Sequence, residues 1–163
     1  MSFPQVFVDS SAQLASVNDA SALHPQGTLC WDYSSTYKSW RLMKYVQLTG
    51  AVAGTAGAVC RIGDAYGTVT ADINDDQLST ESFGGVCLGT VTIDYYCWVC
   101  VGGIAPCTGD AVVNAGESVV PAAAVDGQMD TMAAGEEDHV FGVALVDATT
   151  AAPTVPVHIY PSF

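Results

Sequence analysis

Six cysteines are the side chains best able to do chemistry in this sequence, and three of them fall between Phe83 and Cys100, in FGGVCLGTVTIDYYCWVC. Cys97 and Cys100 form a C-x-x-C pair, a spacing found in zinc sites and in redox dithiols. A structural zinc site needs four ligands, and no second C-x-x-C is present. A redox pair opens a helix, whereas this pair lies in an apolar, β-rich run. On a strand the two thiols would point to opposite faces, so we expect buried packing thiols.

Cys100 and Cys107 remain a candidate disulfide pair, because we expect the GGIAP segment between them to form a turn. The chain carries no recognisable export signal, which favours free thiols instead. Both interpretations stay open at this point.

The acidic stretch that begins at Asp72 starts like a calcium-binding loop. It departs from the pattern where the pattern is strict, with Gln77 in place of the glycine and Phe83 in place of the glutamate. We therefore expect a solvated loop here and at Glu136–Asp138, with a weak cation site between subunits as the alternative. The three histidines are far apart in sequence, and no nucleophile elbow or phosphate-binding loop is present. We predict no enzyme activity, metal or cofactor.

The net charge of −13 limits the classes of partner. A surface this acidic repels nucleic acid and anionic membranes. Three of the four basic residues, Lys38, Arg41 and Lys44, lie within seven positions, and none follows Arg61. We read this cluster as a solvated strand face or as a docking surface. Without a signal peptide or a membrane-spanning run, we expect synthesis in the cytoplasm of the producing cell.

Strand patterns cover most of the chain, and an all-β fold is predicted. The segment Tyr37–Leu48 alternates Trp40, Leu42, Val46 and Leu48 with Arg41, Met43, Tyr45 and Gln47. Short β-rich runs separated by glycine and aspartate follow up to Tyr160. Only Ser10–Ala22 and Ala122–Ala134 have acceptable helix formers. We expect a compact β-barrel or β-sandwich at residues 27–163, preceded by an extended N-terminal arm at residues 1–26.

Similar segments suggest a degenerate internal repeat in this domain, at about 58–100 and 109–160. The first copy is read as Gly63–Ala71, Phe83–Leu88 and Tyr96–Val99. The second is read as Gly109–Val113 with Val119–Ala122, then Phe141–Leu145 and Val155–Ile159. The copies predict two related β half-units that pack together, although β-rich segments can also resemble each other by chance.

The order of segments resembles the capsid decoration, or cement, proteins of tailed bacteriophages. The resemblance rests on Gly27–Leu29, the strand Tyr37–Leu48, the turn Gly50–Gly54, the Gly-Asp-Ala segments at 63 and 109, and the closing runs Phe141–Ala148 and Val155–Ile159. It implies an all-β homotrimer on the outside of the virion capsid. Its partners would be the major capsid protein and further copies of itself, and it would stabilise the shell.

Two segments are predicted to make these contacts. The first is the N-terminal arm with its apolar side chains, and the second is the aromatic and basic strand, since aromatics and arginine dominate interface energies. The candidate interface residues are Phe3, Val6, Phe7, Lys38, Trp40, Arg41, Lys44 and Tyr45. Alternatives are another phage structural subunit, such as a head-fibre base, a minor capsid subunit or a tail component, or a carbohydrate-binding β-module that uses Tyr95, Tyr96 and Trp98.

Overall fold

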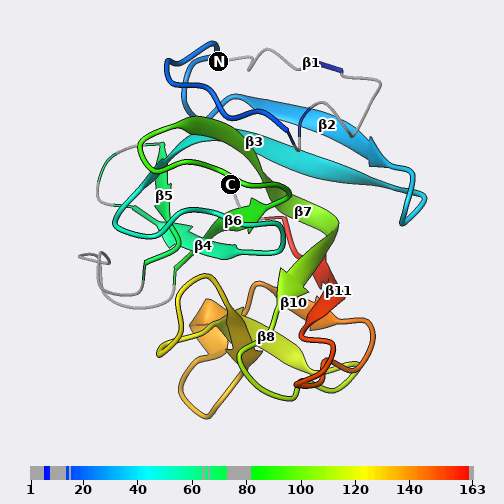
Figure 1. The fold of residues 1–163 in the computed structure, drawn as a ribbon. Coiled ribbons are helices and arrows are strands. Elements are labelled where there is room, and N and C mark those ends of the chain that lie inside the picture. Colours follow the sequence, from blue (N-terminus) through cyan, green and yellow to red (C-terminus); the bar gives the residue numbers. More distant parts are fainter. Residues whose placement is uncertain are drawn as a thin grey trace.

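The computed structural model describes residues 6–7, 14, 16–63, 65, 67–72 and 82–161. Within these residues, eleven strands join one continuous mixed sheet, which confirms the predicted all-β fold (Figure 1). The strands are β1 (Val6–Phe7), β2 (Leu29–Ser34), β3 (Ser39–Thr49), β4 (Val59–Ile62), β5 (Thr68–Thr70), β6 (Phe83–Cys87), β7 (Tyr96–Thr108), β8 (Ser118–Pro121), β9 (Met129–Thr131), β10 (Gly142–Ala144) and β11 (Thr154–Ile159), with a 3-10 turn η1 (Glu137–His139). The helix-forming run at 122–134 instead forms turns and β9.

Five strands close into a ring, the first barrel, in the order β3-β5-β4-β6-β7 and back to β3. β3 closes it by pairing parallel with β5 and antiparallel with β7. Alternation along each strand sends one set of small and β-branched side chains inward. The resulting core comprises Leu42, Val46, Leu48, Ala58, Cys60, Val69, Ala71, Cys87, Val91, Cys97, Val99 and Val101.

Strands β8–β11 repeat the same arrangement and form a second barrel with the second half of β7. The antiparallel pairs β4–β5, β4–β6 and β6–β7 are matched by β8–β9, β8–β10 and β10–β11. The role of β3 falls to the second half of β7, which pairs antiparallel with β11 through residues 103–108. A parallel bridge from Gly109 to Met129 replaces the β3–β5 pairing. The two barrels therefore share β7, which runs from one into the other (Figure 1).

Loop contacts agree with this equivalence. The N–H of Cys87 donates to the carbonyl of Ala58 in the first barrel, and that of Ala144 donates to the carbonyl of Glu117 in the second. The isolated bridge Gly54–Val91 has its counterpart in Val113–Ala148. The topology thus equates β4 with β8 and β5 with β9. The sequence analysis matched Gly63–Ala71, which contains β5, with a segment that ends in β8. The opening segments of the two copies were therefore aligned wrongly by one strand.

The long strand β7 separates two hydrophobic cores. Cys97 and Val99 point into the first barrel, whereas Trp98 and Cys100 belong to the core on the opposite face, which continues into the second barrel. The predicted alternation of faces is therefore confirmed. The predicted GGIAP turn is wrong: β7 continues through it with a bulge at residues 100–102, and Gly103 has a φ of 92°. A side chain there would meet the backbone of Trp40, so glycine is required.

Residues 16–26 of the predicted N-terminal arm lie against the first barrel. Asp19 bridges to Tyr96 at the start of β7, and the N–H of Leu23 donates to the hydroxyl of Tyr45. The ring of His24 packs on Tyr45 and Trp98, at 5.1 and 5.4 Å between centroids. This part of the arm is therefore anchored by the body of the protein.

Candidate functional site

The predicted contact residues separate into surface and interior groups. Trp40 and Lys38 are exposed and Lys44 is half-buried. Arg41 and Tyr45 are buried, so neither is available as a surface contact of the free chain. Arg41 and Tyr45 lie on the face of β3 opposite to Trp40, because side chains alternate along a strand. That face packs onto the core that continues into the second barrel, so both side chains are buried. Val6 and Phe7 form β1, while Phe3 lies outside the described residues.

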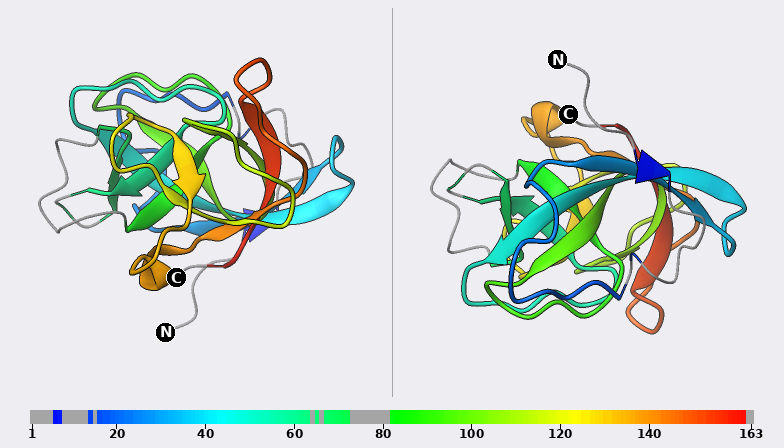
Figure 2. Two further views of the ribbon diagram at one scale, coloured as in Figure 1. Left: turned by 90° about the horizontal axis from the view of Figure 1, so that it is seen from below. Right: turned by 90° about the horizontal axis from the view of Figure 1, so that it is seen from above.

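Among the residues that the structure describes, the β2–β3 hairpin carries the largest group of exposed aromatic side chains on neighbouring strands. Trp31, Tyr33 and Trp40 have exposed fractions of 36%, 41% and 55%. We call these three residues, together with Lys38 and Lys44, the aromatic face. Tyr33 lies directly opposite Trp40 in the antiparallel register, with ring centroids 5.4 Å apart and ring planes at 64°. Figure 2 shows this hairpin projecting beyond the barrels.

The face arises from strand geometry at the edge of the first barrel. Trp40 shares its side of β3 with Leu42, Val46 and Leu48, which are buried in the first core. Because the hairpin runs past the barrel, the same side of the sheet becomes solvent-exposed at Trp40. β1 pairs with the outer edge of β2, which sets Phe7 beside Trp31 in the register. The structure thus brings the two predicted contact segments together.

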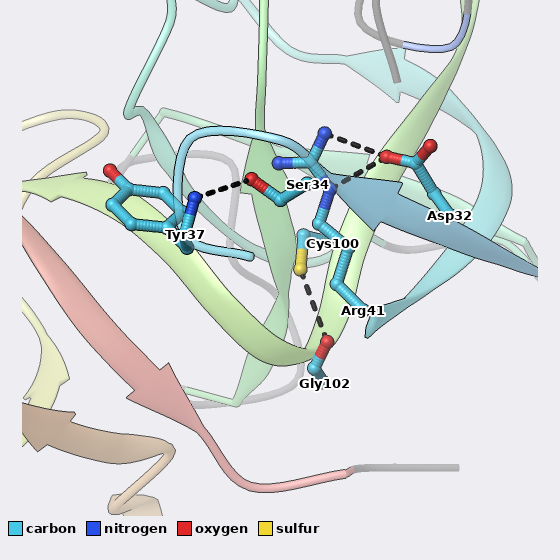
Figure 3. Close-up of polar contacts among 6 residues, drawn as sticks. All are labelled: Asp32, Ser34, Tyr37, Arg41, Cys100 and Gly102. Atoms are coloured by element: carbon cyan, nitrogen blue, oxygen red, sulfur yellow. Dashed lines mark hydrogen bonds and ion pairs between the residues drawn. The ribbon is translucent and has the colours of Figure 1, made fainter. Parts of the chain in front are cut away.

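Beneath the face lies a buried ion pair (Figure 3). The Nε and Nη2 atoms of Arg41 both contact Oδ2 of Asp32 at 2.7 Å. Asp32 is fully buried, and its Oδ1 has no hydrogen-bond partner. The two residues face each other across β2 and β3, so the pair ties the two strands together from below. The aromatic face therefore rests on an ordered, charged layer.

The turn of the hairpin is also defined by specific contacts. The N–H of Tyr37 donates to Oγ of Ser34, and Lys38 has a φ of 52° (Figure 3). A non-glycine residue in the left-handed region is uncommon and costs free energy. Lys38 is therefore held at the tip in a conformation that glycine would adopt more easily.

The cysteines do not form the chemistry that their spacing suggested. All six are free and buried, so the candidate Cys100–Cys107 disulfide is not formed. Burial raises the pKa of Cys30 to about 12, with a further contribution from Asp32, and raises the pKa of Cys100 to about 11. Sγ of Cys60 lies 3.5 Å from Sγ of Cys87 inside the first barrel. Over the described ranges, no three His, Cys, Asp or Glu side chains gather as metal ligands.

The other candidate groups lie apart. Asp72 is buried at the end of β5 and accepts a hydrogen bond from the N–H of Ala51, while 73–81 of the acidic loop are outside the described residues. Glu136 precedes η1, and its carboxylate binds the N–H of Ala133. Trp98, expected on a carbohydrate-binding face, is buried in the core. No helix in the described portion is long and apolar enough to cross a membrane.

Sequence reasoning missed Trp31 and Tyr33. The signal was present in the β2 sequence LCWDYS, where large aromatic side chains alternate with Cys30, Asp32 and Ser34. Aromatic residues usually mark the buried side of a strand, so the exposed side is identified only once β2 is paired with β3.

No protein-family model matches this chain, and no curated protein matches it.

Proposed function

We propose that this chain is a structural virion protein that binds the outer surface of a phage capsid through the aromatic face and stabilises the shell. The observation that carries the proposal is the group of three exposed aromatic rings on a projecting hairpin. Tyrosine and tryptophan are the residues that most often supply the binding energy of protein interfaces. Exposed clusters of this kind are uncommon on monomeric surfaces and mark interaction sites.

The distribution of charge supports the same orientation. Lys38 and Lys44 belong to the aromatic face, whereas the chain after Arg61 has no lysine or arginine. Opposite ends of the molecule therefore differ in charge, which favours docking by the hairpin end. The acidic second barrel would face away from the shell. The proposed partners are the major capsid protein and further copies of this chain, arranged as a homotrimer on the lattice.

A rigid hairpin suits this role, because a preorganised surface loses less conformational entropy on binding. The buried Asp32–Arg41 pair and the ordered Ser34–Tyr37 turn provide that rigidity. Repetition around a symmetry axis would multiply weak contacts into stable attachment.

Co-sedimentation with capsid shells tests the proposal. The shells would be assembled from the major capsid protein of the same phage. Trp40→Ala should weaken binding by about 2 kcal/mol, or roughly 30-fold in Kd, if Trp40 is a central anchor. Leu145→Ala is the matched control, because this side chain is 43% exposed and lies on the second barrel. Equal binding by both variants would contradict docking through the aromatic face, and the native mass of the free protein would test the trimer.

A carbohydrate-binding module is the second candidate, since exposed aromatics also stack on sugars. The 64° angle between Tyr33 and Trp40 gives no flat platform, which favours a protein partner. Binding to glycans without binding to shells would favour the carbohydrate alternative. Binding to purified tails or head fibres in place of shells would favour a different virion subunit.

A further inference from the structure

A cavity of about 270 Å³ lies between the start of β6 in the first barrel and η1 and the end of β11 in the second. Phe83 and Phe141 form part of its wall, with rings stacked at 4.3 Å and 4° between planes. Tyr160 and Pro161 contribute from the segment after β11. This volume is just below the usual range for ligand pockets, so the cavity suits a single side chain better than a large cofactor. No residue of the aromatic face lines it.

The polar side chains that line this cavity are those of Ser82, Asp138, His139 and Tyr160. The neighbouring carboxylates are already engaged, because Glu136 accepts from the N–H of Ala133 and Glu137 from that of Gly135. Across the described portion of the chain, the Asp138 carboxylate has no hydrogen-bond or ion-pair partner. It is thus a negative charge at an aromatic-walled cavity, free to accept hydrogen bonds from a ligand.

The charges around the cavity favour a positively charged ligand. No lysine or arginine lines the cavity. Arg61 lies opposite Phe83 in the strand register, but it is buried and its guanidinium donates to the carbonyl of Ala122. Aromatic rings attract cations through their faces, and a guanidinium can also lie flat against such a face. A carboxylate can accept two parallel N–H bonds from the same planar group.

We propose that this cavity binds a guanidinium group, as presented by an arginine side chain of a partner protein. Asp138 would accept hydrogen bonds from the guanidinium, and the rings of Phe83 and Tyr160, which are partly exposed, would pack against its faces. The site does not depend on which partner the aromatic face binds, so the two proposals can fail separately.

An NMR titration of the isotopically labelled full chain with N-acetyl-L-arginine amide tests the site. The expected result is saturable shifts of resonances from Asp138, His139 and Tyr160. N-acetyl-L-citrulline amide, which has nearly the same shape and no charge, should leave them unshifted. Equal shifts with citrulline amide would overturn the proposal, and equally tight binding of N-acetyl-L-lysine amide would overturn its assignment to a guanidinium.

Substitutions of cavity residues test whether the arginine amide binds in this cavity. Asp138→Asn should weaken the arginine amide about tenfold, as expected for loss of one charge-assisted interaction. Asp94→Asn is the charge-matched control, because Asp94 is exposed outside the cavity and its φ of 66° is one that asparagine tolerates. Tyr160→Ala, at an exposed position, gives a second variant that should also weaken binding. Unchanged affinity in both cavity variants would overturn the proposal.

Discussion

The buried ion pair beneath the aromatic face allows a sharp test by substitution. Arg41→Met removes the charge that neutralises Asp32 but keeps a long apolar side chain. Asp32 is fully buried, and its Oδ1 already has no partner, so both carboxylate oxygens would be left unpaired. Breaking a buried pair by removing one partner costs about 3–5 kcal/mol of unfolding free energy. We expect a loss in this range.

The matched control is Lys44→Met, on the same strand and with the same change of charge. Lys44 is half-buried, and it forms no ion pair with any residue that the structure describes. Its substitution should change stability by no more than about 0.5 kcal/mol. The double variant Arg41→Met with Asp32→Leu replaces the pair with apolar side chains and should recover most of the loss.

Urea unfolding, followed by tryptophan fluorescence, measures the free energy of unfolding of the parent protein, Arg41→Met, Lys44→Met and the double variant. The reasoning predicts a large loss for Arg41→Met alone, with recovery in the double variant. It is refuted if Arg41→Met unfolds at the same urea concentration as Lys44→Met, since Asp32 would then not need its partner. It is also refuted if the double variant is less stable than Arg41→Met.

Three further predictions concern two equivalent glycines, the carboxyl group of Asp110 and the six thiols. Gly57 and Gly116 hold equivalent positions with φ of 87°, but a Cβ at Gly57 would lie 2.9 Å from Oγ1 of Thr108, whereas one at Gly116 meets nothing within 4 Å. Gly116→Ala should lower the free energy of unfolding by about 1 kcal/mol, from backbone strain alone. Gly57→Ala should lower it by about 2–3 kcal/mol, because the new side chain also clashes. Equal losses in urea unfolding would argue against this steric difference. Burial, and then Asp130, raise the pKa of Asp110 above 3.8, so its protonated form favours folding and its contribution to stability is lost as pH rises through that raised pKa. Asp110→Asn should therefore melt at a higher temperature than the parent at pH 7 and at the same temperature near pH 3, and a lower melting temperature at pH 7 would contradict this. The six buried thiols should resist an aromatic disulfide reagent at pH 8 and all react in denaturant, whereas fast reaction of the native protein would show that the cores open.

Much of the fold could be predicted from local pattern. Alternation in β3 correctly placed Leu42 and Met43 on opposite faces, and the apolar run of β7 correctly placed Cys97 and Trp98 on opposite faces. These predictions succeed because the side-chain period of a strand is two, wherever the strand lies.

The failures have a shared cause in pairing between distant segments. Gly102–Gly103 resembles a turn, but β3 pairs with β7 as far as Gly102 and β11 pairs with it from Gly103 onward, so the strand continues through the bulge. Arg41 looks like a surface cation, but Asp32 faces it across the hairpin and lets it be buried. The repeat was aligned one strand out of step because pairing defines which strands are equivalent.

The sequence by itself determined that the chain is all-β, that its strands have two distinct faces and that its basic residues are confined to one region. Each of these depends only on composition or on spacing along the chain. The tertiary structure decided which face is covered: strand pairing fixes the neighbours of each residue. It therefore left Trp31, Tyr33 and Trp40 exposed while it buried Arg41 and Tyr45.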